Sequence, residues 1–160
     1  MRFLLAFCVL LVFFTGCGDD SRVFEEISDF ERREWLNTDK PEFEFVIHSV
    51  IDKYNLYGDI RNSVSYPYSR FFFNYYLQDS TGKELQKDLK MEYLFDATSG
   101  KPKGSSGIGD LYDHQFLLLK DYQFKNKGKY KVVFEQFMRM DTLPGILAVG
   151  LRVEKVSRIK

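Results

Sequence analysis

The fold is decided by residues 71–82, which read FFFNYYLQDSTG. Residues on alternate positions of this stretch form two faces, and the first face is entirely large and apolar. The first face carries Phe71, Phe73, Tyr75 and Leu77, and the second carries Phe72, Asn74, Tyr76 and Gln78. This period of two predicts a β-strand with at least one face in the core. Asp79-Ser80-Thr81-Gly82 then supplies the turn residues of a hairpin.

The same alternation continues on both sides of this stretch. Further runs with period two occupy residues 43–47, 56–60, 85–95, 130–138 and 147–153. Turn residues separate the runs, and the Gly-, Ser- and Lys-rich residues 96–110 predict the longest loop. Strands at this spacing predict an all-β protein, an antiparallel β-sandwich of jelly-roll or immunoglobulin-like type.

Two turns support this fold. Leu143-Pro144-Gly145 stands between the last two runs, where proline presets φ and glycine accepts a positive φ. Asn126–Tyr130 resembles the tyrosine corner of Greek-key sandwiches, in which a tyrosine near the start of a strand bonds back to the backbone.

The first residues predict a lipoprotein signal peptide. Arg2 is positively charged, and residues 3–14 form an apolar run too short to span a bilayer. Thr15-Gly16-Cys17 then resembles the bacterial lipobox, in which the cysteine is diacylated and becomes the first residue. Cys17 would be the only cysteine of the mature chain, and acylation accounts for an odd thiol in an exported protein. We therefore expect a membrane anchor through lipid on Cys17.

This N-terminus divides the chain into a signal peptide (1–16), a lipidated tether (17–40) and a β-sandwich domain (41–160). Within the tether, residues 22–36 show no clear period, and we expect a short strand and a loop there. Gly18 rather than aspartate follows the cysteine. Resemblance to lipoprotein sorting rules then favours the outer membrane over the inner membrane of the cell envelope.

Composition predicts one folded domain that does not bind nucleic acid. The chain has 160 residues, of which 44% are hydrophobic and 17% aromatic, enough to offset the ordering entropy. Its 23 Lys and Arg balance its 23 Asp and Glu, and loss of Arg2 with the signal leaves a net charge of −1. A nearly neutral chain lacks the positive field that holds nucleic acid.

No motif predicts a catalytic residue, a metal site or a cofactor. His114 follows Asp110 and Asp113, but this spacing matches no zinc or calcium motif. The glycines of residues 104–109 lack the Lys-Ser/Thr of a phosphate loop, and no Gly-x-Ser-x-Gly nucleophile motif occurs. We expect no enzyme, although a carboxylate pair for glycoside hydrolysis depends on tertiary structure that the sequence leaves open.

The aromatic band of residues 66–76 permits two interpretations. The face with Tyr68, Phe72 and Tyr76 is either covered by the second sheet and its loops or open to a partner. Tyrosine and arginine on an open strand face are typical of binding hot spots.

Several segments in order resemble the GldH family of gliding motility lipoproteins of Bacteroidota. They follow Cys17 and are Tyr54-Asn55-Leu56-Tyr57, Ile60-Arg61-Asn62, Tyr66-Pro67-Tyr68, Gly107–Phe116, Gln136–Ile146 and Val149–Glu154. The resemblance covers essentially the whole mature chain. It implies a membrane-anchored, non-enzymatic accessory of the gliding apparatus, which is tied to the type IX secretion system.

The expected partners are other gliding or secretion proteins of the envelope. We expect the working surface in residues 104–116 and 136–146, with Gly107, Gly109, Asp110, Asp113, His114, Arg139 and Asp141 as candidate contact residues. The alternative is an envelope carbohydrate-binding module, which requires Tyr68, Phe72 or Tyr76 to be exposed on a flat face. A third hypothesis, an envelope hydrolase, requires two carboxylates that converge in a cleft.

Overall fold

The computed structural model describes residues 21–156, which form eleven strands and no helix. The strands are β1 (Arg22–Asp29), β2 (Glu34–Leu36), β3 (Glu42–Ile47), β4 (Tyr54–Ser63), β5 (Arg70–Asp79), β6 (Glu84–Tyr93), β7 (Ser105–Ser106), β8 (Leu111–Tyr122), β9 (Gly128–Gln136), β10 (Thr142–Pro144) and β11 (Ile146–Lys155). The predicted signal peptide and the lipidated Cys17 lie outside the described residues.

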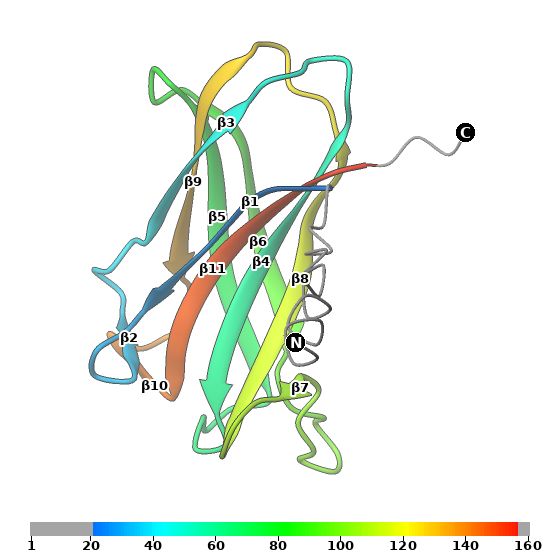
Figure 1. The fold of residues 1–160 in the computed structure, drawn as a ribbon. Coiled ribbons are helices and arrows are strands. Elements are labelled where there is room, and N and C mark those ends of the chain that lie inside the picture. The colour runs from blue at the N-terminus through cyan, green and yellow to red at the C-terminus, as the bar shows by residue number, and fades with distance from the viewer. Residues whose placement is uncertain (1–20, 157–160) are drawn as a thin grey trace, which may run out of the picture.

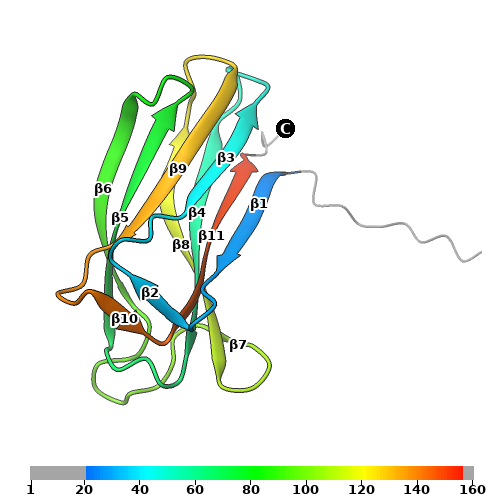
Figure 2. The ribbon, with the colours of Figure 1, turned by 90° about the vertical axis from the view of Figure 1, so that its left-hand side faces the viewer.

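Two antiparallel sheets pack face to face, which confirms the predicted β-sandwich (Figure 1, Figure 2). One sheet has the order β1-β11-β4-β8-β7 and the other the order β3-β9-β5-β6. A short pair of strands, β10 and β2, adds to one side of the sandwich. The chain crosses from sheet to sheet after β3, β4, β6 and β8, so strands that follow one another in sequence often face each other across the core.

The core is built on the apolar face of β5, as the alternation predicts. Phe71, Phe73 and Leu77 are fully buried, and Tyr75 is 2% exposed. The rings of Phe71 and Phe73 stack at 5.2 Å between centroids. The hydroxyl of Tyr75 donates a hydrogen bond of 3.2 Å to the Leu118 carbonyl, so a polar contact ties β5 to β8 of the opposite sheet.

The predicted turns are confirmed. The carboxylate Oδ1 of Asp79 accepts hydrogen bonds from the backbone N–H groups of Thr81 and Lys83, and Gly82 has a φ of 81°. The Tyr130 hydroxyl donates to the Asn126 carbonyl at 2.7 Å, which is the contact of a tyrosine corner.

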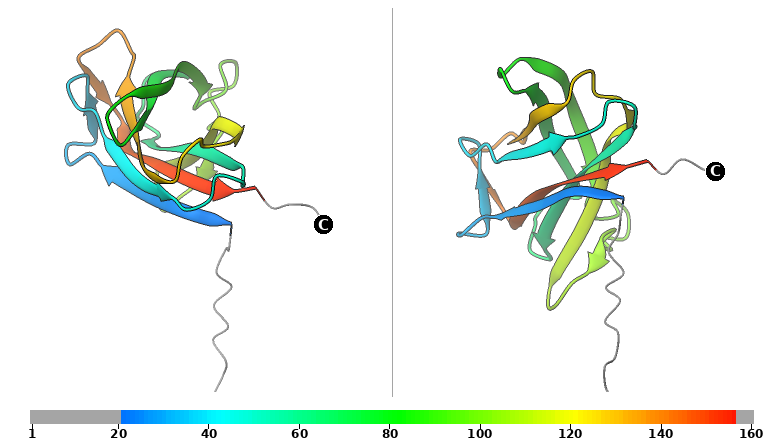
Figure 3. Two further views of the ribbon diagram at one scale, coloured as in Figure 1. Left: turned by 90° about the horizontal axis from the view of Figure 1, so that it is seen from above. Right: turned by 45° about the horizontal axis from the view of Figure 1, so that its top comes forward.

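The structure corrects the predicted start of the sandwich. We expected residues 17–40 to form a tether, but β1 pairs with β11 and β2 pairs with β10. Both segments bury large rings: Trp35 is fully buried, and Phe24 packs 5.9 Å from Phe45. The sandwich therefore begins at Arg22, and β1 lies beside β11 when the molecule is seen from above (Figure 3).

The sequence did not predict β8, which with 12 residues is the longest strand. Its pairing with β4 shifts register twice, on both sides of Leu56. Such irregularities insert extra residues and break the period of two on which strand prediction depends. The first part of β8 holds Asp113 and His114, which we expected on the working surface of residues 104–116.

Candidate functional site

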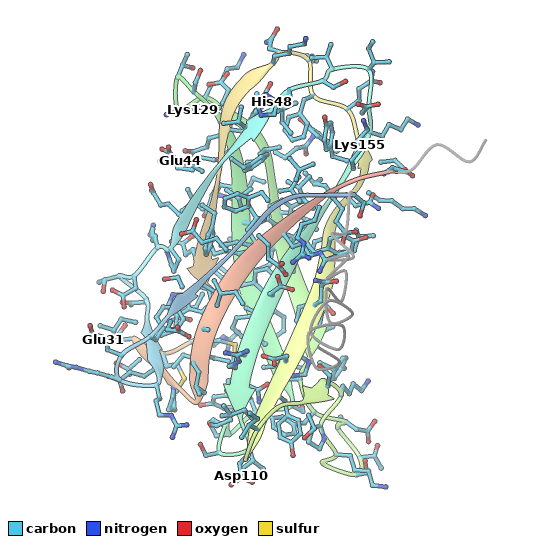
Figure 4. The ribbon with its side chains drawn as sticks, viewed as in Figure 1. Glu31, Glu44, His48, Asp110, Lys129 and Lys155 are labelled. Carbon is cyan, nitrogen blue, oxygen red and sulfur yellow. The ribbon has the colours of Figure 1, made fainter. Side chains whose placement is uncertain are left out.

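The seven predicted contact residues lie in two groups near one end of the sandwich. Asp110 marks this end in Figure 4, opposite the end that carries His48 and Lys155. Gly107, Gly109 and Asp110 lie between β7 and β8, and two further candidates lie within β8. Arg139 and Asp141 lie in the connection from β9 to β10.

His114 is 6% exposed and therefore belongs to the interior rather than to a contact surface. Its Nε2 lies 2.8 Å from Oδ1 of Asn62, which is fully buried, and its ring stacks on Phe116. Because the Asn62 Oδ1 atom can only accept, Nε2 donates in this contact. Burial lowers the pKa of His114, which favours the neutral imidazole. Gly104 packs against this ring so closely that a Cβ there would lie 2.7 Å from Nε2.

Asp113 forms a two-point ion pair with Arg61, directly opposite it on β4. The Nε and Nη2 atoms of Arg61 donate to the two carboxylate oxygens of Asp113 at 2.7 and 3.3 Å. Both side chains are partly exposed, so this pair contributes at most about 1 kcal/mol to stability. It fixes one wall of a polar trough.

The polar trough is a hollow of about 320 Å³ on the outer face of the five-stranded sheet. Asp59, Arg61, Asp113 and Gln115 line it, beside Ile27. Oδ1 of Asp59 accepts a hydrogen bond of 2.9 Å from Gln115, but its buried Oδ2 has no hydrogen-bond partner among the described residues. Burial raises the pKa of Asp59 in spite of the bond from Gln115.

The glycine loop, residues 107–110 before β8, is held in place by backbone hydrogen bonds. The N–H of Gly107 donates to the Leu111 carbonyl at 2.9 Å, and Gly109 has a φ of 76°. The Asp110 carbonyl accepts a hydrogen bond from the N–H of Val64, which ties this loop to the β4–β5 connection. The side chain of Asp110 is exposed.

Arg139 contributes to an apolar groove of about 580 Å³ on the outer face of the four-stranded sheet. The apolar groove is lined by Tyr68, Arg70, Phe72, Leu89, Phe137, Met138, Arg139 and Met140. Phe137 is 56% exposed and Leu89 is 47% exposed, so large apolar side chains face solvent there. Two arginines and no acidic residue line it, which suits a partner with apolar side chains and carboxylates.

A buried glutamine shapes one wall of the apolar groove. Gln136 is 3% exposed; its Nε2 donates to the Met140 carbonyl, and its Oε1 accepts from the N–H of Met138. The N–H of Phe137 donates to the Phe72 carbonyl at 2.9 Å. These bonds fix residues 137–140 against β5, so the exposed ring of Phe137 projects from a held loop.

The second face of β5 is covered over part of its length and open at its start. Asn74 is 7% exposed, and the Tyr76 hydroxyl hydrogen-bonds to the Glu135 carboxylate. Tyr68, just before the strand, is 38% exposed in the apolar groove. The aromatic band is therefore covered around Asn74 and Tyr76 and open to a partner at Tyr68.

Asp141 is held by hydrogen bonds from Asn37 and does not line the apolar groove. Its Oδ1 accepts a hydrogen bond of 2.7 Å from Asn37, and its carbonyl accepts one from the Asn37 N–H. The apolar groove and the polar trough have no lining residue in common. They lie on the outer faces of different sheets.

Sequence reasoning missed several residues of both hollows. Asp59 and Arg61 belong to an alternating run, but the register that places them beside Gln115 became visible only with β8. Leu89 occurs in a predicted strand without any sign that it would lie beside Phe137. The signal that was available is Arg139 among the apolar residues Phe137, Met138 and Met140.

Within the described residues, neither a cluster of metal-ligating side chains nor a membrane-spanning helix is present. No group of three or more His, Cys, Asp or Glu side chains within residues 21–156 is arranged to hold a metal ion. Over the same range there is no helix of sufficient length and apolar character to cross a membrane.

Comparison with known proteins identifies relatives over nearly the whole chain. The family model described as GldH lipoprotein matches residues 22–153. A protein of Christiangramia forsetii named "Gliding motility lipoprotein GldH homolog" is 31% identical over 159 residues, which cover 93% of each chain. "Gliding motility lipoprotein GldH" of Flavobacterium johnsoniae is 28% identical over 144 residues, which cover 86% of this chain and 87% of that protein.

Among solved structures, the chain resembles VP2 of the infectious bursal disease virus subviral particle, with a TM-score of 0.41 and 11% identity. The match covers 84% of this chain but only 34% of the viral one. A second structure of that virus, from the Gx strain, gives a TM-score of 0.35 and 10% identity, over 85% of this chain and 30% of that one. Likeness at this level carries no functional argument.

Proposed function

The chain belongs to the GldH family of gliding motility lipoproteins, and from this premise we propose that it is a non-enzymatic accessory component of the gliding apparatus, tied to type IX secretion. The observation that carries the proposal is the family match over residues 22–153, which include every described strand except the end of β11. The exposed apolar side chains and the two arginines of the apolar groove support a role in binding.

The proposed anchor is lipid on Cys17, with palmitate among its acyl chains. Gly18 after the cysteine favours the outer membrane. A doubly or triply acylated cysteine holds a protein stably on a membrane, whereas a single chain binds only marginally. The sandwich would then stay in the envelope, where the other gliding and secretion proteins are.

The proposed working surface is the apolar groove. A complementary partner is a segment of another envelope protein that places apolar side chains against Phe137 and Leu89 and carboxylates near Arg70 and Arg139. Large exposed apolar side chains beside arginine are the composition of interface hot spots. The glycine loop before β8 gives a second, more polar surface at the same end, with the exposed Asp110.

A clean chromosomal deletion tests this function. Reintroduction of the wild-type gene is compared with Cys17→Ala and with Cys8→Ala, a matched control that removes a thiol from the signal segment and leaves the acylation site. We expect the deletion and Cys17→Ala to abolish spreading on agar and to lower release of type IX cargo, while Cys8→Ala restores both. Normal spreading and normal secretion in the deletion strain would refute the proposal.

A second candidate function is carbohydrate binding, because the ring of Tyr68 is 38% exposed beside Arg70 in the apolar groove. Sugar sites combine an aromatic platform with polar groups that hydrogen-bond to hydroxyls. The polar side chains of the groove are Tyr68 and the two arginines, so it offers few acceptors for sugar hydroxyls. A glycan array with wild type and Tyr68→Ala separates the two functions. A specific glycan hit that the substitution removes favours carbohydrate binding.

A further inference from the structure

We propose that the end of the sandwich formed by residues 48–53 and 123–127 rests on the membrane surface, with Ile51 entering the lipid layer. We call this end the membrane face. The inference rests on the proposed lipidation of Cys17 and adds an orientation to it, in which the apolar groove lies toward the end far from the bilayer.

The first step is the length of chain between the lipid and the sheet. Three residues, Gly18, Asp19 and Asp20, separate Cys17 from Ser21. Four Cα-to-Cα steps of at most ~3.6 Å per residue span about 14 Å. Ser21 therefore lies within about 14 Å of the acylated cysteine in any conformation of the linking residues.

The second step is the position of Ser21 in the fold. Its carbonyl accepts a hydrogen bond of 2.7 Å from the N–H of Lys155, at the end of β11. Next to it the N–H of Val156 donates to the Lys53 carbonyl at 2.8 Å. Lys155 Nζ also pairs with Asp52 at 2.7 Å. The three linking residues thus bring residues 48–53 close to the bilayer, at the end that Lys155 marks in Figure 4.

The third step is the chemistry of the membrane face. Ile51 is 72% exposed, although it is a large aliphatic residue. Gln123 donates a hydrogen bond of 2.9 Å to the Val50 carbonyl, so the loop of Ile51 is held against the β8–β9 connection.

The membrane face also carries lysines. Residues 48–53 and 123–127 hold Lys53, Lys125 and Lys127 against the single acidic residue Asp52. An exposed aliphatic tip on a face that carries lysines matches a lipid surface, where the apolar side chain enters the acyl layer and ammonium groups meet lipid phosphates.

Exposure alone does not identify the membrane face. Ile108, in the loop between β7 and β8, is 96% exposed at the opposite end of the sandwich. With the membrane face on the bilayer, Ile108 stands well away from the lipid, because the strands between the two ends are ten or more residues long and rise ~3.3 Å per residue. Ile108 is therefore a matched control for Ile51.

The test uses the processed, lipidated protein in vesicles of phosphatidylethanolamine and phosphatidylglycerol. Ile51→Cys and Ile108→Cys are each labelled with an environment-sensitive fluorophore, and the vesicles are prepared with and without brominated lipid. We expect the label at residue 51 to shift to shorter wavelength and lose emission to the brominated lipid, while the label at residue 108 does neither. Equal behaviour of the two labels, or quenching at residue 108 alone, would overturn the inference.

The mass of the purified chain separates this inference from its premise. A mass with acyl chains on Cys17 and no quenching at residue 51 contradicts only the membrane face. An unmodified Cys17 contradicts the proposed anchor as well. Because Ile51 is exposed, its substitution leaves the core intact, and unchanged thermal unfolding of both variants in detergent checks this.

Discussion

At the scale of single residues, Asp59 sets a pH dependence of stability. Burial raises its pKa above the ordinary value of 3.8, and one carboxylate oxygen has no partner among the described residues. Between 3.8 and the raised pKa the folded state binds more protons than the unfolded state, so stability falls as pH rises through this range. The ionised Asp59 carboxylate therefore destabilises the folded state at neutral pH.

We predict that Asp59→Asn removes this part of the pH dependence. The free energy of unfolding should fall more steeply from pH 4 to pH 7 in the wild type than in the variant. Urea denaturation at a series of pH values measures both slopes. Gln115→Ala should steepen the slope, because it removes the hydrogen bond that holds the pKa down. Parallel slopes in all three proteins would contradict the account.

Residue types alone did not reveal which candidate side chains were available for contact. Asp113 and His114 were predicted as surface residues, yet one is paired with Arg61 and the other is buried against Asn62. Their partners lie 52 positions away in sequence, so only the strand register brings them together.

At the scale of elements, the β10–β11 turn is the most constrained of the predicted turns. Gly145 has a φ of 80°, and its N–H and carbonyl bond to Arg33 and Ser63. A Cβ at this position would lie 2.8 Å from the Cα of Tyr66. Gly82 in the β5–β6 hairpin has a nearly identical φ of 81° with open space around it.

Comparison of Gly82 with Gly145 separates the cost of a positive φ from the cost of steric crowding. Gly82→Ala should cost about 1 kcal/mol of unfolding free energy, from the positive φ alone. Gly145→Ala should cost about 1–3 kcal/mol more, because the backbone of Tyr66 must move. Thermal or urea denaturation of the two variants gives the comparison. If both lose the same stability, the close approach of the two turns is not a constraint on the fold.

Strands with a long run of undisturbed alternation were predictable, and β8 was not. β3, β5 and β9 appear where the period of two placed them. β8 did not, because two register shifts interrupt its pairing with β4. β2 and β10, of three residues each, are too short to show a period, and their burial depends on the contact between Trp35 and the core.

At the scale of the whole molecule, the proposals give the sandwich two working ends. The membrane face lies where Ser21 enters β1, and the apolar groove lies near the other end, beside residues 137–140. The fold class followed from sequence, but the groove did not, because it gathers side chains from β5, β6 and the β9–β10 connection. Only packing of the strands defines such a surface.

Substitution of one exposed residue separates the role of the apolar groove in binding from the stability of the fold. Phe137→Asp places a charge in the groove, whereas Leu117→Asp, at a residue 43% exposed on β8, places the same charge outside it. Because both side chains are largely exposed, we expect both variants to fold. Only Phe137→Asp should weaken partner binding.

The most direct test of the central claim is affinity purification of the lipidated protein from detergent-solubilised envelope, followed by mass spectrometry. We predict that gliding or secretion envelope proteins co-purify with wild type and with Leu117→Asp, and that Phe137→Asp loses them. A wild-type protein that purifies without any such protein would contradict the role of this chain as an accessory component of the gliding apparatus.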